Sequence, residues 1–250
     1  MLKKVLIGVC SALALTGAVA VVHEQAVAEP ESKAVIELFT SQGCSSCPPA
    51  DKLLGKLARR DDVVALTFPV DYWDYLGWKD TLASPAYSTR QRDYAKSRGD
   101  GEVYTPQVVV DGVSHAVGSR PSEIRRAIAQ SKRKLRNARV PLKMRTDGDT
   151  LVITVGAAPD GARVKPATIW LALVKKEETV KIARGENRGR TITYHQVVRD
   201  MTPIGHWKGK SMVIRLPKHH LQKSDADGCT VLLQQDTAGP VIAAAEMKNW

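Results

Sequence analysis

Two cysteines, Cys44 and Cys47, are the residues of this sequence whose types and spacing are best suited to chemistry. They stand between an apolar stretch at 35–39 and a stretch with helical spacing at 50–60. At such a turn the two sulfurs can bond to each other, and the helix N-terminus favours the thiolate form of the first thiol. A thiolate attacks disulfides, and the second thiol can release the resulting mixed disulfide. The pair therefore predicts either thiol–disulfide exchange or an inert crosslink.

A Thr-Pro pair, Thr105 and Pro106, directly precedes a predicted β-hairpin at 107–117. Together with a Cys-x-x-Cys after the first strand, it resembles the thioredoxin superfamily. The resemblance implies that Cys44 is the nucleophile, that Cys47 is the resolving thiol, and that Pro106 is a cis-proline beside them. It also implies that the backbone at Thr105 pairs with a bound peptide or thiol substrate. The alternative is a trans proline that merely opens a strand.

The longer segments 35–51 and 70–78 resemble an uncharacterised family of secreted bacterial proteins within the thioredoxin-like group. This resemblance spans most of the chain after its N-terminal segment. It implies a fold, but the family implies no particular activity.

The residues after the second cysteine depart from the thioredoxin pattern, in which the helix simply continues. Here Pro48 and Pro49 follow Cys47. Proline fits the first turn of a helix, but deeper in the helix it removes a donor and clashes. We therefore expect the helix to begin near Cys47, which leaves Cys44 in the preceding loop with a weaker influence from the helix dipole.

The segment 71–78 is rich in aromatic residues and follows the second predicted parallel strand, at 63–68. Functional loops gather at the carboxyl ends of parallel strands, so this segment should border the cysteines. Its first residues, Asp71, Tyr72 and Trp73, are candidate substrate-binding residues. The alternative is a small local core under a long loop.

Three further residues carry hypotheses of their own. Glu37 lies inside a strand predicted to be covered on both faces, where an unpaired carboxylate is costly. It is a candidate proton relay for Cys47, unless it pairs with a basic residue or reaches an edge. His115 is the first candidate for a third ligand if the cysteine pair holds copper(I), which soft thiolates favour. Cys229 opens a predicted strand and is expected to be buried and inert.

The elements that must position these residues fall into two halves. Over 33–139, apolar strands alternate with helical stretches, which predicts an α/β thioredoxin-like domain. Over 140–250 the pattern has period two and no helix, which predicts an antiparallel β-sandwich-like domain. The predicted strands of this second half lie at 151–155, 168–174, 191–198, 212–216, 229–235 and 241–247.

The N-terminus resembles a secretory signal peptide at 1–28. Lys3 and Lys4 precede an apolar run at 5–22, and Ala-Val-Ala at 26–28 offers a cleavage site. The alternative is an uncleaved membrane anchor. The protein is therefore predicted to be exported, either periplasmic or secreted.

The formal net charge is +11, and much of it falls within 120–145, which holds ten basic residues and one acid. Apolar residues recur there at helical spacing, so the charges lie on an outer face. Such a face can contact an anionic membrane surface weakly, or it is simply solvated. Export argues against a nucleic-acid partner. The 43% hydrophobic and 25% charged composition excludes collagen-like, coiled-coil and wholly disordered chains.

These observations favour an exported thiol–disulfide oxidoreductase, or a redox-responsive protein, that acts on a protein or small-molecule thiol or disulfide without a cofactor. Two alternatives stay open. One is a copper(I)-binding module that uses the same cysteines. The other is a non-catalytic binding protein with a passive disulfide.

Overall fold

The cysteine pair follows a fully buried central strand, β1 (Ala34–Thr40). β1 pairs in parallel with β2 (Val63–Pro69) and antiparallel with β3 (Gln107–Val110). Alternate residues of β1 point to opposite faces of the sheet, and both faces are covered by helices. This is why the strand is a continuous apolar run rather than an alternating one.

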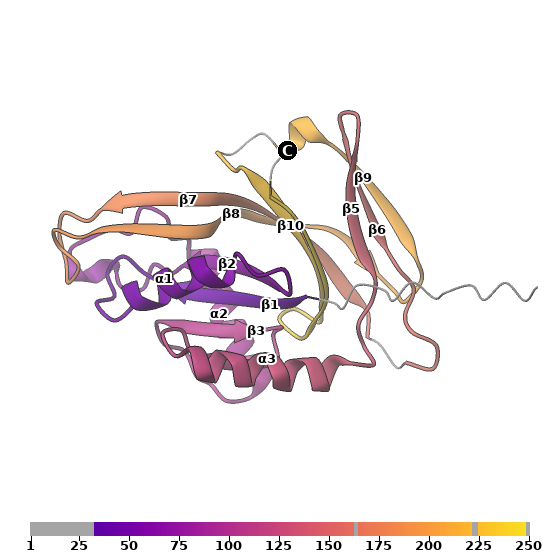
Figure 1. The fold of residues 1–250 in the computed structure, drawn as a ribbon, viewed down its shortest axis with the longest axis horizontal. Helices are drawn as coiled ribbons and strands as arrows, with labels where there is room; N and C mark the ends of the chain where they lie inside the picture. The colour runs from indigo at the N-terminus through magenta and orange to yellow at the C-terminus, as the bar shows by residue number, and fades with distance from the viewer. Residues whose placement is uncertain (1–32, 163–164, 222–224, 249–250) are drawn as a thin grey trace, which may run out of the picture. The chain divides into compact units, whose positions relative to one another are not determined.

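The computed structural model describes residues 33–162, 165–221 and 225–248. The predicted signal peptide at 1–28 lies outside these residues. Eight strands form one sheet in the order β11-β10-β7-β8-β2-β1-β3-β4, and three form a second sheet in the order β5-β6-β9 (Figure 1). The other elements are, in chain order, α1 (Pro48–Leu57), η1 (Asp74–Leu76), α2 (Pro85–Arg98), β4 (Ser114–Val117), α3 (Pro121–Leu135), β5 (Leu142–Asp147), β6 (Thr150–Val155), β7 (Ala167–Lys181), β8 (Thr191–Trp207), β9 (Met212–Pro217), η2 (Lys218–His220), β10 (Gly228–Gln235) and β11 (Val241–Met247).

The two faces of the large sheet have separate cores. On one face, Val35 and Phe39 of β1 pack in a cluster with Tyr87 and Tyr94 of α2. On the other face, residues of β1 pack with residues of α1 and α3. The basic helix α3 buries its apolar stripe and exposes most of its basic residues, as its spacing predicts. No helix of the described ranges is long and apolar enough to cross a membrane.

The prediction of an α/β thioredoxin-like domain at 33–139 followed by a separate β-sandwich at 140–250 is wrong. Strands from both halves belong to the same eight-stranded sheet, because β8 pairs in parallel with β2 at Thr67 and Val197. The Thr67 hydroxyl also donates to the His195 carbonyl at 2.6 Å. The chain from Ser32 to Trp250 accordingly forms one compact unit.

The two halves share a sheet because β2 would otherwise have an unpaired edge. An apolar edge strand exposes unpaired N–H and C=O groups, and the sheet removes that liability by adding β8. β8 and β7 are long enough to reach beyond this edge, so their far ends also carry the core under the β5-β6-β9 sheet (Figure 1). There the two sheets pack on each other, in a cluster that includes Cys229. That thiol is buried as predicted, and burial raises its pKa to about 12.

Candidate functional site

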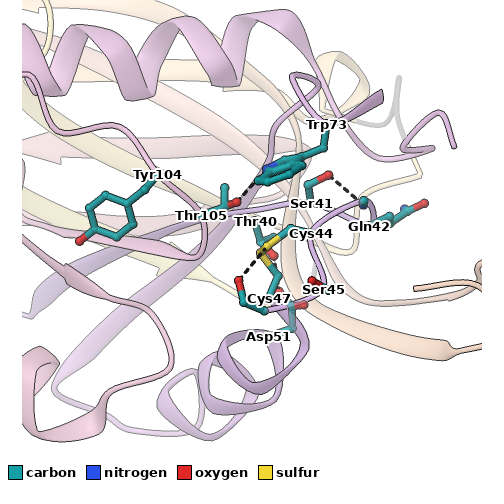
Figure 2. The surroundings of a disulfide bond; sticks show 12 residues. Thr40, Ser41, Gln42, Cys44, Ser45, Cys47, Asp51, Trp73, Tyr104 and Thr105 are labelled. Carbon is teal, nitrogen blue, oxygen red and sulfur yellow. Dashed lines mark hydrogen bonds between the residues drawn. A yellow bond between two sulfur atoms is a disulfide. The ribbon is translucent and has the colours of Figure 1, made fainter. Parts of the chain in front are cut away.

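Cys44 and Cys47 form a disulfide in the turn between β1 and α1 (Figure 2). The turn is closed by two backbone hydrogen bonds, from the N–H of Cys44 to the Ser41 carbonyl and from the N–H of Cys47 to the Cys44 carbonyl, both at 3.2 Å. Both cysteines are buried, with exposed fractions of 1% and 0%, whereas Ser45 and Ser46 between them are exposed. The disulfide therefore lies just beneath a polar turn.

The helix begins directly after the second cysteine, as Pro48 and Pro49 predict. Cys47 is the N-cap residue of α1, and its carbonyl accepts the first two helical N–H groups, those of Ala50 at 2.8 Å and Asp51 at 3.2 Å. The two prolines carry no N–H, so the helix N-terminus has lost two of the donors that would stabilise a thiolate. The sulfur of Cys44 lies 3.4 Å from the Ser46 hydroxyl.

Trp73 and Thr105 lie beside the disulfide, as the sequence predicts (Figure 2). The indole N–H of Trp73 donates to the Thr105 hydroxyl at 2.8 Å. The Thr105–Pro106 peptide bond is cis, as the resemblance implies. A Cβ added to Gly43 would lie 2.9 Å from the Trp73 Cβ, so the cysteine turn packs directly against this aromatic residue. Glycine is required at this position for the close approach.

The other two candidate substrate-binding residues of this segment, Asp71 and Tyr72, form hydrogen bonds with α2. The backbone N–H of Asp71 donates to the hydroxyl of Ser88 on α2 at 3.2 Å, and that hydroxyl donates to the Asp71 carboxylate. The Tyr72 hydroxyl donates to the Gln91 side chain on the same helix, at 3.2 Å. Both side chains therefore anchor the 71–78 segment to α2, whereas Trp73 packs against the cysteine turn.

Glu37 does not lie in the disulfide site. Its carboxylate accepts two hydrogen bonds from Arg90, at 2.6 and 2.9 Å, and one from the Tyr94 hydroxyl, at 2.5 Å. These partners belong to α2, on the face of the sheet opposite α1. Glu37 thus pairs with a basic residue, Arg90, which was the alternative to a proton relay at this position.

Asn187 is a site residue that sequence analysis missed. It lies in the turn between β7 and β8, and its buried amide donates to the carbonyls of Gln42 at 2.9 Å and Cys44 at 2.8 Å. In the same turn, Glu186 accepts from the N–H of Ser45 at 3.2 Å. No local signal distinguishes this asparagine from any other turn residue, because the contact joins positions more than 140 residues apart.

Asp51, another residue that sequence analysis missed, is the carboxyl group of this site. It is 2% exposed and follows Cys47 by one helical turn, so its side chain tilts back toward the cysteine. Thr40 donates to one carboxyl oxygen at 2.7 Å, and the other oxygen has no partner among the described residues. Burial raises the pKa of Asp51 to about 8. The hydrogen bond from Thr40 lowers this pKa, and the negative charge of Asp80 raises it further.

The buried surroundings of Asp51 are acidic. Asp80 is 4% exposed and accepts from the N–H of Gln42 at 2.7 Å, and burial raises its pKa. The Tyr194 hydroxyl is also buried and has no hydrogen-bond partner in the described ranges. Burial raises the pKa of this phenol too, and the charges of Asp51 and Asp80 add to the effect.

Replacing Asp51 with Asn should flatten the dependence of stability on pH. The carboxyl has a raised pKa of about 8 when folded, against an ordinary value of 3.8. Between these values the folded state binds more protons than the unfolded state, so the free energy of unfolding falls as pH rises. Asp51→Asn removes this loss and should gain at least about 1 kcal/mol near pH 8, because one pKa unit is worth about 1.4 kcal/mol. Urea unfolding from pH 4 to 9 measures it.

The control for this measurement is Asp61→Asn, at an exposed position, which should keep the wild-type slope. Equal slopes in the wild type and Asp51→Asn would contradict the raised pKa of the buried carboxyl.

His115 is not brought to the cysteine pair. Its Nδ1 lies 2.9 Å from the Tyr104 hydroxyl, and its Nε2 lies 3.4 Å from a carboxyl oxygen of Asp100. Burial lowers the pKa of His115, and the charge of Arg98 lowers it further. Within the described part of the chain, no group of three or more His, Cys, Asp or Glu side chains is placed to hold a metal ion. This geometry does not favour the copper(I) alternative.

A family model described as "Protein of unknown function (DUF1223)" matches residues 35–234, which include the disulfide turn and Asn187. The chain belongs to the DUF1223 family. This confirms the resemblance to an uncharacterised family. No curated protein matches the sequence.

Two solved structures resemble this DUF1223 protein. The crystal structure of protein AGR_C_4864 from Agrobacterium tumefaciens has a TM-score of 0.77 and 36% sequence identity, over 88% of this chain and 96% of that one. HBP35 of Porphyromonas gingivalis has a TM-score of 0.57 and 13% identity, over 88% of this chain and 76% of that one. At that identity the second likeness concerns the fold alone.

Proposed function

We propose that this DUF1223 protein is an exported thiol–disulfide oxidoreductase that acts through Cys44 and Cys47. The observation that carries the proposal is the disulfide between neighbouring cysteines at a strand-to-helix turn, with Thr105 and Trp73 beside it. These local features are shared with the thioredoxin superfamily, although the fold predicted from that resemblance is wrong. Export is part of the proposal, because disulfides persist in oxidising compartments and the N-terminus has the composition of a signal peptide.

In the oxidised form, the proposed reaction begins when a substrate thiolate attacks the Cys44 sulfur. The bond between the two cysteine sulfurs breaks, a mixed disulfide forms at Cys44, and Cys47 leaves as a thiolate and takes up a proton. A second substrate thiolate attacks the substrate sulfur of the mixed disulfide and releases Cys44. Two substrate thiols become one disulfide, and the cysteine pair gains two electrons and two protons. The reverse reaction passes through the same mixed disulfide.

Asp51 is suited to move the proton that this reaction needs at Cys47. With a pKa of about 8, it is mostly protonated at neutral pH and can give a proton to the leaving thiolate. Its position one helical turn after Cys47 places the carboxyl on the side of the cysteine away from Trp73 (Figure 2). Asp51 thus takes the role predicted for Glu37, which is held by Arg90.

The burial of both cysteines favours a second candidate function, a passive disulfide in a non-catalytic binding protein. A buried crosslink is protected from thiols and holds the cysteine turn against the β7–β8 turn through Asn187. Buried structural disulfides of exported proteins have low reduction potentials, below about −300 mV.

The reduction potential of the pair separates the two functions. The double variant Cys10→Ala with Cys229→Ala, which keeps only Cys44 and Cys47 of the four cysteines, is equilibrated in dithiothreitol buffers, alkylated and measured by mass spectrometry. An oxidoreductase should give a midpoint between about −120 and −270 mV. A midpoint below about −300 mV would contradict the proposed function and support the passive disulfide.

A further inference from the structure

A cavity of about 350 Å³ lies between the N-terminal half of α2 and strands β7 and β8. It is on the α2 face of the large sheet, opposite the face that α1 covers. Its size is within the range of small-molecule sites in proteins. The disulfide site contributes no residue to it, so the cavity is a second, separate feature of the molecule.

The walls of the cavity are largely apolar and aromatic. Tyr87 comes from α2, Trp170 from β7, Met201 from β8 and Ala238 from the turn between β10 and β11. All four belong to, or pack against, the core cluster on this face, so the walls are held by the sheet rather than by a loose loop. An indole and a phenol ring offer a flat apolar surface and electron-rich faces that attract cations.

The two arginines at the cavity already have partners. Arg90 is bound by both carboxyl oxygens of Glu37, and its side chain is only 9% exposed. Arg199 donates to Asp225 at 3.0 Å. Each positive charge therefore has a carboxylate next to it, although the Arg199–Asp225 pair is partly exposed and the charge of Arg199 still lowers the pKa of Tyr87.

The two carboxylates that line the cavity are matched less completely, although the charge of Asp93 acts on Arg90. Asp93 lies 3.8 Å from Lys96, whose side chain is 81% exposed, and such a surface pair contributes little. Asp200 accepts from the Thr202 hydroxyl at 2.9 Å and forms no ion pair with the described residues. Burial raises the pKa of the Tyr87 phenol to about 12; the negative charge of Asp200 adds to this shift, and the positive charge of Arg199 opposes it. When Arg90, Arg199 and Asp93 are each counted with an ion-pair partner, Asp200 leaves the cavity with one negative charge in excess, in a chain whose net charge is +11.

We propose that this cavity binds an organic cation, such as a protonated or quaternary amine that carries an aromatic or other compact apolar group. The apolar part would lie against Trp170 and Tyr87, and the cationic part would face Asp93 and Asp200. A cation of this kind matches the cavity in both charge and surface. An anion would meet the two carboxylates, and a neutral molecule would leave Asp200 without an ionic partner.

The test is isothermal titration calorimetry of the full chain at low ionic strength with three probes of similar size. These are phenyltrimethylammonium, its neutral isostere tert-butylbenzene, and benzoate. We expect the cation to bind about ten times more tightly than either of the other two, because each carboxylate and each aromatic face adds a modest attraction. Asp200→Asn and Trp170→Leu should each weaken binding of the cation about fivefold.

The matched control is Asp61→Asn, which removes an exposed carboxylate outside the cavity and should bind the cation like the wild type. Thermal unfolding of each variant shows that it is folded under the conditions of the titration. The proposal is overturned if benzoate or tert-butylbenzene binds as tightly as the cation. It is also overturned if Asp200→Asn binds like the wild type, or if the cation shows no saturable binding up to about 10 mM.

Discussion

The Cys47→Ser variant should accumulate mixed disulfides at Cys44 when it is offered a disulfide substrate, and Cys44→Ser should accumulate roughly a tenth as much or less. In Cys47→Ser the first thiol can attack, but no second thiol remains to release the adduct. In Cys44→Ser the remaining thiol is enclosed. Cys47 is 0% exposed and caps α1 beside Asp51. Cys44 is also buried, at 1%, but its sulfur contacts the hydroxyl of the exposed Ser46 and so lies next to the surface.

The measurement is a thiol-trapping gel with mass spectrometry of the adduct, on variants that also carry Cys10→Ala and Cys229→Ala. Ser45→Ala is the matched control, because it changes an exposed residue of the same turn and keeps both thiols. This control should trap no more than the wild type. Equal trapping by the two serine variants, or none by either, would contradict the assignment of Cys44 as nucleophile.

The Arg90→Met variant should lose about 3–5 kcal/mol of stability, the usual cost of leaving one member of a buried ion pair without its partner. Arg90 donates to both carboxyl oxygens of Glu37, to the Tyr94 hydroxyl at 2.7 Å and to the Gln234 side chain at 3.0 Å. The carboxylate is 1% exposed, so no water can replace these bonds. Urea unfolding at pH 7 measures the loss.

The chain offers a matched control in Arg60 and Asp62, which form the same two-bond pair at 2.8 and 2.7 Å on the surface. Their side chains are 40% and 44% exposed, so Arg60→Met should cost no more than about 1 kcal/mol. The double variant Glu37→Leu with Arg90→Met should be more stable than Arg90→Met alone by at least about 1 kcal/mol, because it removes the stranded charge. Equal losses from Arg90→Met and Arg60→Met would contradict this account.

The helix that holds Arg90 shows why part of the fold was beyond sequence analysis. The residues that α2 buries are Tyr87, Ser88, Gln91, Tyr94 and Ala95, several of them polar. Such a helix has no apolar stripe, and the stripe is the signal by which a helix is recognised in a sequence. Its polar face can be buried because strands of the sheet supply polar partners. Gln91 donates a hydrogen bond to the Gln107 side chain at 2.8 Å, and Arg90 forms an ion pair with Glu37.

The disulfide turn shows the opposite case, in which local chemistry decides the structure. Cysteines three positions apart can bond only across a tight turn, and prolines after the second cysteine start the helix there. The sequence also determined the strands at 35–39, 63–68 and 107–110, because each is a short apolar run bounded by turn residues. For each of these features the information lies within a few residues of the chain.

Only the tertiary structure decided how the strands pair and what surrounds the cysteines. Hydrophobic periodicity shows which side of a strand is buried but not which strand lies next to it. The pairing of β8 with β2 therefore could not be predicted from the sequence pattern. Asn187 and the cavity beside Trp170 depend on that pairing, since each brings together side chains from distant parts of the chain. The sequence alone therefore determined the cysteine pair and its turn. The shared sheet determined what surrounds them: the buried carboxyl of Asp51, the turn that carries Asn187, and the cavity beside Trp170.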